Sequence, residues 1–313
     1  MQVKNAVLTM SDGAEIFINR WIPDEEQEIK GIVQLHHGLA EHSMRYDRLG
    51  SIFAENGYVF NAYDMRGHGK TAENAENKGT GLFGKLADKN GFNRVVEDLN
   101  EIIDSVKKDY PNKKTVLLGH SFGSFVSQSY IETYGNKIDG CILSGTAGPR
   151  PTLITFGNAV SKIIESFRGK NAIVPFLSNL SFGSYNNKIE NPASKNSWLS
   201  VNELNVQMYE MDKWCGFPLT CSFYCDMTDG LKKIHKPANM KKIPSKLPVY
   251  FIYGEDDPVG DYGKTINKLY KIYRDNGIEK VDIKSYKNAR HELFNEDIKE
   301  QVENDVISWI SGI

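Results

Sequence analysis

The pentapeptide Gly119-His120-Ser121-Phe122-Gly123 is the strongest local signal in this chain, because it lies where an apolar strand pattern gives way to a helical one. Residues 115–118 are typical of a buried strand, and residues 122–134 have helical spacing. A sharp turn from strand to helix lifts a serine hydroxyl clear of the sheet on a strained backbone, and flanking glycines leave room for it. Ser121 is therefore a candidate nucleophile. The alternative is that it only caps the helix.

Length and composition indicate a globular protein with one large domain or a domain that carries an insertion. The chain has 313 residues, 40% of them hydrophobic, and its 38 basic and 40 acidic residues leave a net charge of -2. Because no long block carries one sign of charge, we expect no binding to nucleic acid. The sequence shows neither an apolar signal segment nor a run of the roughly 18 apolar residues that a transmembrane segment needs, which predicts a cytoplasmic protein.

Four cysteines occur without a Cys-x-x-Cys pair: Cys141, Cys215, Cys221 and Cys225. They are too few for a disulfide scaffold in a chain of this length, and no suitably spaced histidine accompanies the three that cluster. We therefore expect reduced, packed thiols and no metal site.

Strand and helix patterns alternate along most of the chain, after an N-terminal hairpin at residues 11–21. Strand patterns cover residues 31–35, 58–62, 115–118, 140–144, 249–253 and 281–286, and helical patterns cover residues 44–56, 92–108, 122–134, 264–276 and 296–311. This alternation is typical of right-handed βαβ units around a mostly parallel central sheet with helices on both faces. The fold class is therefore α/β.

The alternation stops near residue 150 and returns near residue 241. The residues between contain an amphipathic stretch and a polar stretch with aromatic residues along it, but no strand–helix period. We expect residues 1–150 and 241–313 to form one core, with residues 151–240 inserted as a cap over one end of the sheet.

A serine nucleophile needs an imidazole base, and only two of the seven histidines follow Ser121 in the sequence. His235 lies in a lysine-rich segment. His291 lies in a loop between the last strand and the last helix, at the carboxyl edge of the sheet where open α/β sheets bind ligands. We therefore predict His291 as the base.

The acid that orients the base is expected directly after a strand, and Glu255, Asp256 and Asp257 all follow the strand that ends at residue 253. Pro258 restricts the backbone before it to extended geometry, which gives Asp257 a rigid position from which to aim its carboxylate. Asp257 is therefore preferred over Asp256.

Acyl transfer also needs hydrogen-bond donors for the oxyanion. The backbone N–H of Phe122 starts the nucleophile helix, where the helix dipole assists. Gly38 permits a tight turn after an earlier strand, which would direct the backbone N–H of Leu39 into the same pocket. We interpret three nearby imidazoles as supports of these loops: those of His36, His37 and His120.

These residues together resemble the α/β-hydrolase superfamily, and within it the monoacylglycerol lipases and lysophospholipases. The resemblance covers nearly the whole chain, in motifs at residues 37–46, 64–69, 119–123, 254–257 and 289–292. Residues 181–186, 198–200 and 212–217 are similar to the cap of bacterial lysophospholipases. The resemblance implies the α/β-hydrolase fold with an inserted cap, and a catalytic triad of Ser121, Asp257 and His291.

The resemblance also implies substrate contacts for Glu41 and Arg45, because the matching residues of monoglyceride lipases lie near the glycerol end of the substrate. The alternative is an ion pair that braces the loop. Animal monoglyceride lipases have a second histidine three residues after the catalytic one, whereas this chain has Phe294 there. This departure bears on recognition of glycerol and not on ester hydrolysis.

Residues 79–84 spell Gly-x-Gly-x-x-Gly, but they follow a polar stretch and not a strand, so they do not indicate a dinucleotide site. Residues 69–71 end like a phosphate-binding loop, but Asp64 occupies the place of its first glycine. We expect no nucleotide, metal or other cofactor.

The sequence therefore predicts a serine hydrolase that cleaves acyl esters, such as monoacylglycerols or lysophospholipids, through an acyl-enzyme on Ser121. Apolar cap residues would line an acyl channel, contact a lipid surface or only pack the cap: Phe176, Leu177, Leu180 and Phe182. Two alternatives stay open. One is a proline-aminopeptidase-like peptidase, with a cap acid for the substrate amine (Glu190, Glu203, Glu210 or Asp212), and the other is a non-catalytic binding protein of the same fold.

Overall fold

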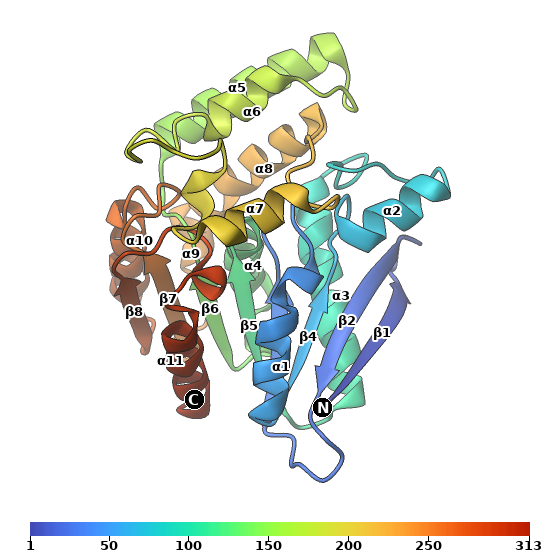
Figure 1. Cartoon of the computed structure of the whole chain (residues 1–313), viewed down its shortest axis with the longest axis vertical. Helices are drawn as coiled ribbons and strands as arrows, with labels where there is room; N and C mark the ends of the chain where they lie inside the picture. The colour runs from blue at the N-terminus through green and yellow to red at the C-terminus, as the bar shows by residue number, and fades with distance from the viewer.

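The computed structural model describes residues 1–313 and contains one eight-stranded sheet in the order β1-β2-β4-β3-β5-β6-β7-β8 (Figure 1). Its strands are β1 (Gln2–Thr9), β2 (Glu15–Ile22), β3 (Gly31–His36), β4 (Tyr58–Tyr63), β5 (Lys114–His120), β6 (Gly140–Ser144), β7 (Val249–Gly254) and β8 (Val281–Tyr286). The β1–β2 and β2–β4 pairs are antiparallel, and all other pairs are parallel. The predicted hairpin and mostly parallel sheet are confirmed.

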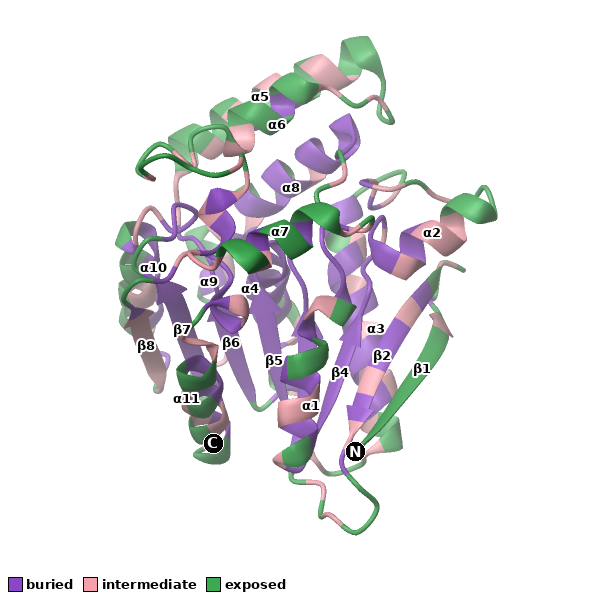
Figure 2. Cartoon of the chain, viewed as in Figure 1, coloured by how far each residue is buried: buried purple, intermediate pink, exposed green.

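Helices cover both faces of the sheet, as predicted (Figure 1). Outside the insertion they are α1 (Asp47–Glu55), α2 (Gly69–Asn77), α3 (Gly91–Asp109), α4 (Phe122–Tyr134), α10 (Lys264–Asp275) and α11 (Lys299–Ser311). Phe53 of α1 and Val306 of α11 share one hydrophobic cluster, whereas Leu99 of α3 and Leu269 of α10 belong to the other. Strands β3, β4, β6 and β7 lie between these apolar layers and are buried along their whole length (Figure 2).

The turn between β5 and α4 carries the pentapeptide. Ser121 has φ 52° and ψ -119°, a strained backbone for a residue with a Cβ atom. A Cβ atom at Gly119 would lie 2.3 Å from Ser127 Oγ, and one at Gly123 would lie 2.1 Å from the backbone oxygen of His36. Only glycine fits at either position, because α4 begins directly against the chain that leaves β3.

The residues between β6 and β7 form a layer of helices over the carboxyl ends of the parallel strands (Figure 1). They comprise α5 (Pro151–Arg168), α6 (Pro175–Phe182), η3 (Ser197–Leu199), α7 (Glu203–Met211), α8 (Cys221–Ile234) and α9 (Pro237–Met240). Phe223 and Met227 of α8 belong to the same hydrophobic cluster as α3 and α4. The insertion is therefore anchored in the core through α8, and the division of the chain into a core and a separate cap stays a prediction.

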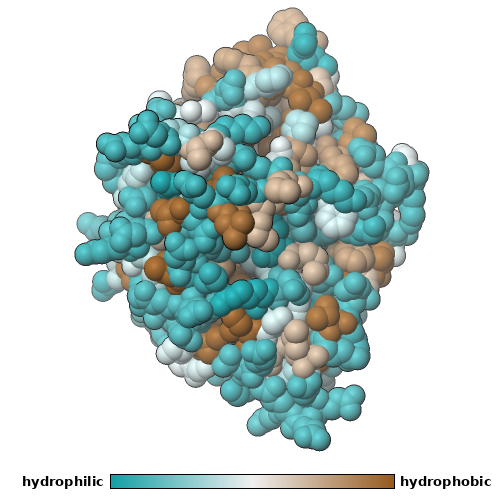
Figure 3. Space-filling view, viewed as in Figure 1, coloured by the Kyte–Doolittle hydropathy of each residue, from teal (hydrophilic) through white to brown (hydrophobic).

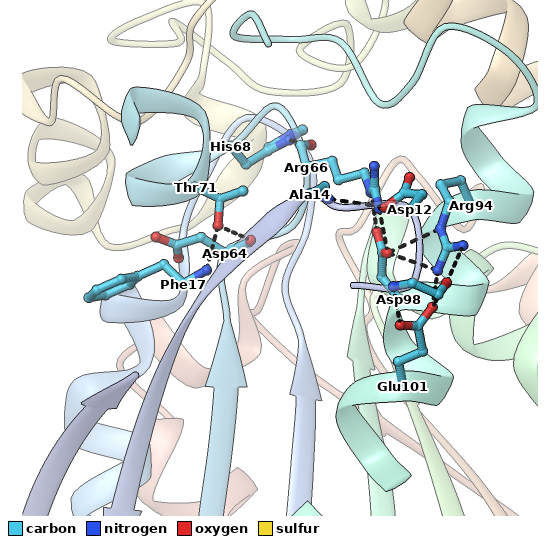
Figure 4. A network of polar contacts seen from close by, with 11 residues as sticks. Asp12, Ala14, Phe17, Asp64, Arg66, His68, Thr71, Arg94, Asp98 and Glu101 are labelled. Carbon is cyan, nitrogen blue, oxygen red and sulfur yellow. Dashed lines mark hydrogen bonds and ion pairs between the residues drawn. The ribbon is translucent and has the colours of Figure 1, made fainter. Parts of the chain in front are cut away.

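The loop after β4 is held by buried charges. The Asp64 carboxylate accepts hydrogen bonds from the backbone N–H and the hydroxyl of Ser43. Arg66 forms ion pairs with Asp98 of α3 and with Asp12 of the β1–β2 turn (Figure 4). This loop therefore connects the hairpin, α3 and the segment after β3.

Apolar side chains are exposed on the outer surface of the insertion. Apolar side chains gather over α5 at the upper end of the molecule (Figure 3), and four of its residues are exposed: Leu153, Phe156, Ile163 and Phe167. None of the helices is both long and apolar enough to cross a bilayer. All four cysteines are buried and unpaired, as expected of packed thiols.

Candidate active site

A cavity of about 590 Å³ lies between the carboxyl ends of the strands and the inserted helices. Its walls include Ser121, His291, Leu39 and Phe122, which the sequence analysis assigned to the reaction. Apolar side chains of the insertion complete the walls, among them Ile154, Val174, Leu177, Leu180, Phe182, Met227 and Leu231. The structure thus brings four predicted site residues together from three segments, which follow β3, β5 and β8.

His291 is hydrogen-bonded to Asp257, which lies behind it and is fully buried. Nδ1 of His291 is 2.9 Å from Oδ2 of Asp257, and the other carboxylate oxygen accepts a hydrogen bond from the N–H of Val259 at 2.9 Å. Burial lowers the pKa of His291, but the charge and hydrogen bond of Asp257 outweigh it and leave the pKa raised. Since Nδ1 is hydrogen-bonded to Asp257, Nε2 is the nitrogen that can exchange a proton with a substrate or a nucleophile.

The competing residues have different surroundings. Glu255 and Asp256 are exposed, so neither lies behind His291. His235 also lines the cavity, but no carboxylate is hydrogen-bonded to it, and burial lowers its pKa to about 4. Of the candidates, only Asp257 and His291 form an acid–imidazole pair.

Ser121 lines the same cavity as His291, and its hydroxyl forms no hydrogen bond to the imidazole. Hydrogen bonds of this kind are often long without substrate and shorten in the bound complex. The position of Ser121 is set by its backbone, whose N–H donates to the backbone oxygen of Ser144 at 2.9 Å. The nucleophile candidate is therefore held at the end of β6 as well as β5.

The two predicted oxyanion donors are backbone groups at the cavity wall. The N–H of Leu39 donates no hydrogen bond within the chain. Phe122 is the first residue of α4, where helix N–H groups lack intrahelical acceptors. A Cβ atom at Gly38 would lie 3.1 Å from the Cβ atom of Ser121, so the oxyanion turn and the nucleophile are in close contact.

Glu41 and Arg45 form the ion pair that was the alternative to substrate contact. Arg45 Nη1 donates to Glu41 Oε2 at 2.8 Å, and Glu41 Oε1 accepts from the N–H of Gly38 at 2.5 Å and from Tyr46 at 3.0 Å. Glu41 lines the cavity and Arg45 does not. The geometry therefore favours a bracing role for Arg45.

Glu292 completes this charged group; it lies in the motif at residues 289–292, but no role was predicted for it from the sequence. Its carboxylate accepts from Arg45 at 2.5 and 2.7 Å and from Asn205 of α7 at 2.7 Å. Burial raises the pKa of Glu292, but Arg45 lowers it to about 2. Its place beside His291 was the only available signal, since no pattern in the sequence connects it to Arg45.

Trp198 is a second residue that sequence reasoning did not assign to the site. Its ring lies 5.0 Å from the ring of His291, in a tilted arrangement. The rings of Tyr185 and Trp198 pack in a T-shaped arrangement with their centres 4.8 Å apart, and both residues line the cavity. The insertion therefore supplies an aromatic wall beside the imidazole.

One group of three side chains has the composition of a metal site: His42, Asp212 and Cys215, whose ligand atoms lie within 4.8 Å of one another. His42 Nε2 is already hydrogen-bonded to Asp212 Oδ2 at 2.9 Å, and burial raises the pKa of the Cys215 thiol. The His42–Asp212 hydrogen bond connects the oxyanion loop to the insertion, and the Cys215 thiol lies beside it.

The acids named for a peptide amine lie outside this cavity. Glu190, Glu203 and Glu210 line a separate polar pocket of about 170 Å³. Asp212 is paired with His42. The two acids at the cavity wall are Glu41 and Glu292, and both are bonded to Arg45. The cavity therefore offers no unpaired carboxylate for a substrate ammonium group.

Comparisons with known proteins agree with this architecture. A monoacylglycerol lipase of Mycolicibacterium smegmatis is 25% identical over 306 residues, which are 95% of this chain and 93% of the relative. Human monoglyceride lipase is 25% identical over 310 residues, with coverage of 97% and 89%. The crystal structure of a thermostable carboxyl esterase from Bacillus coagulans, in complex with glycerol, superposes with a TM-score of 0.89 at 30% identity and covers 100% of this chain and 99% of its own.

A family model described as "Hydrolase_4: Serine aminopeptidase, S33" matches residues 27–298. This match spans the sheet from before β3 to the segment after His291, and so includes every motif of the resemblance. The chain therefore belongs to the serine aminopeptidase S33 family of the α/β-hydrolase superfamily.

Proposed function

We propose that this protein is a serine hydrolase that cleaves carboxylic acyl esters, with monoacylglycerols as its main substrates. The observation that carries the proposal is one cavity in which Ser121, the His291–Asp257 pair and the unpaired N–H of Leu39 meet a wall of apolar side chains. Support for the glycerol ester comes from the names of the relatives that match this chain over nearly its whole length. Lysophospholipids share the acyl chain and are the second ester class to test.

In the first half of the proposed reaction, Ser121 gives its hydroxyl proton to Nε2 of His291 and its oxygen attacks the acyl carbonyl carbon. The negative charge on the carbonyl oxygen is stabilised by the N–H groups of Leu39 and Phe122. The bond between the carbonyl carbon and the alcohol oxygen then breaks, and the alcohol leaves with the proton from His291. Asp257 keeps the imidazole in the required tautomer and stabilises its charged form.

In the second half, a water molecule gives a proton to His291 and attacks the acyl-enzyme. The same two N–H groups stabilise the new oxyanion. The bond to Ser121 Oγ breaks, the serine recovers its proton from His291, and the fatty acid leaves. Every proton and electron pair is accounted for by protein groups and water, so the reaction needs no cofactor.

Residues 151–240 act in this proposal as a cap that binds the acyl chain and rests on a lipid surface. Support comes from four residues that line the cavity and are also exposed: Leu153, Phe156, Ile173 and Leu180. An apolar cavity rim lets an acyl chain enter with less exposure to water. Of the cap residues named from the sequence, Leu177, Leu180 and Phe182 line the cavity, whereas Phe176 is exposed outside it.

The proposal includes a cytoplasmic location, supported by four cysteines without a disulfide bond. Fractionation of cells that express a tagged chain would test it, and recovery from an extracellular fraction would reject it.

A hydrolysis panel tests the reaction and the substrate class together. Monoacylglycerols, lysophospholipids, short aryl esters and N-terminal prolyl amides are compared for the wild type, Ser121→Ala and the exposed control Ser166→Ala. We expect glycerol esters to be preferred, with activity lost in Ser121→Ala and kept in Ser166→Ala. Ester hydrolysis that survives in Ser121→Ala would reject the mechanism, and a preference for prolyl amides would reject the substrate class. No turnover of any compound would favour the binding-protein alternative.

A further inference from the structure

We propose that His37 is a positioning residue that aims the N–H of Leu39 at the oxyanion, by holding the carbonyl oxygen of the same peptide unit. The inference rests on the proposed function, in which that N–H is one of the two oxyanion donors. His37 is fully buried and does not line the cavity. It therefore acts on the reaction only through the backbone of Gly38 and Leu39.

The hydrogen bonds of His37 determine where its proton lies. Nε2 is 3.1 Å from the backbone nitrogen of Met65, and since a backbone N–H can only donate, Nε2 carries no proton. The proton is therefore on Nδ1, which donates to the carbonyl oxygen of Gly38 at 2.7 Å. Burial lowers the pKa of His37 well below its ordinary value, so the ring keeps this neutral form at neutral pH.

The Gly38 carbonyl and the Leu39 N–H belong to one planar peptide unit. The chain has no cis peptide bond, and in a trans unit the C=O and N–H groups point in opposite directions. Because His37 holds the carbonyl oxygen, the N–H of Leu39 points away from His37. That N–H is unpaired within the chain, and Leu39 lies at the cavity wall.

Glycine at position 38 makes such a restraint necessary. A Cβ atom there would lie 2.7 Å from Glu41 Oε1 and 3.1 Å from Ser121 Cβ, so no larger residue fits. Glycine rotates more freely than other residues, and an unrestrained turn would not hold a donor in one direction. Glu41 fixes the preceding peptide unit through the N–H of Gly38 at 2.5 Å, and His37 fixes the following one.

Two substitutions of His37 separate the two hydrogen bonds. In His37→Asn the side-chain amide nitrogen occupies the place of Nδ1 and still donates to Gly38, whereas in His37→Gln the amide oxygen occupies the place of Nε2 and still accepts from Met65. We expect His37→Gln to lower kcat by about 10- to 100-fold with little change in KM, because a misdirected oxyanion donor acts in the transition state. We expect His37→Asn to keep kcat within about fivefold of the wild type.

His36→Gln is the matched control. His36 is equally buried, and its Nδ1 donates to the carbonyl oxygen of His37 at 3.0 Å. The N–H of the peptide unit that it holds belongs to Gly38 and is bonded to Glu41, so it does not serve the oxyanion. Thermal unfolding of all three variants measures the loss of packing, which we expect to be similar in His36→Gln and His37→Gln.

A long-chain trifluoromethyl ketone provides a readout of the oxyanion site, because the hydroxyl of Ser121 adds to it and leaves an oxyanion in place. We expect His37→Gln to weaken this inhibitor by the same factor as kcat/KM and His36→Gln to leave its binding within about fivefold. Equal losses in His37→Asn and His37→Gln, or in His36→Gln and His37→Gln, would overturn the inference. If His37→Gln does not fold, His37→Asn is measured alone, and a loss of kcat beyond about fivefold overturns the inference. Failure of the proposed function is seen separately, as a wild type without esterase activity.

Discussion

Arg45 and Glu292 form a buried, bidentate ion pair, although they lie 247 positions apart in the sequence. Arg45 Nη1 lies 2.5 Å from Glu292 Oε1, Nη2 lies 2.7 Å from Oε2, and the side chains are 9% and 4% exposed. Arg45 follows the oxyanion turn, and Glu292 follows His291. The pair therefore joins the two loops that carry the proposed donor and the proposed base.

Arg45→Ala should lower the free energy of unfolding by about 3–5 kcal/mol, because it leaves buried carboxylates without their cation. Urea unfolding followed by fluorescence measures this change. The control Lys162→Ala breaks an exposed pair with Asp229 and should change the free energy by less than about 1 kcal/mol. If Arg45→Ala lowers the free energy of unfolding no more than Lys162→Ala does and only raises KM, Arg45 binds substrate and does not brace the loop.

The acid limb of the profile of kcat/KM against pH should report the pKa of His291. Burial lowers the pKa of His291 but Asp257 raises it above the ordinary 6.5, and a base must be unprotonated to act, so kcat/KM should fall as the pH drops through that pKa. Asp257→Asn removes the largest effect that raises this pKa, so the limb should move to lower pH while kcat falls by about 10⁴-fold. The control is Asp256→Asn, whose limb should stay in place. An unchanged limb in Asp257→Asn would contradict the assignment of the acid.

Met227→Trp should shorten the acyl chain that the cavity accepts. Met227 of α8 lines the cavity, and a larger side chain there would fill the part of it that we expect the distal methylenes of a long acyl chain to occupy. The ratio of kcat/KM for dodecanoyl to butanoyl esters should fall by at least about tenfold. Met208→Trp, at an exposed position of α7, should leave the ratio unchanged. Equal ratios in both variants would place the acyl chain elsewhere.

Gly254→Ala should separate the acid loop from the histidine loop. A Cβ atom at Gly254 would lie 2.1 and 2.2 Å from the backbone oxygens of Arg290 and Ala289, so the end of β7 or the loop after β8 must shift. We expect a loss of about 1–3 kcal/mol in stability together with a large loss of kcat. Gly312→Ala, where the nearest atom would be 3.6 Å away, is the control. Wild-type kcat in Gly254→Ala would show that the two loops tolerate displacement.

Glu132 should make the protein less stable as the pH rises. Burial raises the pKa of this α4 carboxyl to about 9, so between pH 4.5 and pH 9 the folded state holds a proton that the unfolded state has lost, and stability falls with rising pH. Glu132→Gln carries no such proton and should be more stable than the wild type at pH 8, by at least about 1.4 kcal/mol. Urea unfolding at pH 6 and pH 8 measures the difference, with the exposed Glu26→Gln as control. An equal loss of stability between pH 6 and pH 8 in the wild type and in Glu132→Gln would assign the pH dependence to other groups.

Local patterns in the sequence predicted much of the fold and of the candidate site. The apolar run before Ser121 and the alternation of strands and helices predicted a mostly parallel sheet, because strands buried on both faces must be apolar. The glycines around Ser121 predicted the strained turn that its φ of 52° confirms. Chain order left His235 and His291 as candidate bases, and the place of His291 after the last strand favoured it.

Other features depend on contacts between distant segments. Residues 151–240 were predicted as a cap inserted into the core, but their pattern did not indicate that α8 packs in the hydrophobic cluster of α3 and α4. It found no histidine partner for the clustered cysteines, yet His42 and Cys215 lie in one group. Local periodicity has no information about which distant helix an apolar face will meet.

The sequence alone determined the sheet, the turn at Ser121 and the candidates for nucleophile, acid and base, because each follows from neighbouring residues or from chain order. Only the tertiary structure showed that Asp257 is hydrogen-bonded to His291, that Arg45 is bonded to Glu292, and that the N–H of Leu39 is left unpaired. Hydrogen bonds and ion pairs of this kind act over a few ångströms in space, whatever their separation in the chain, so they become visible only when the loops at the carboxyl ends of the strands come together.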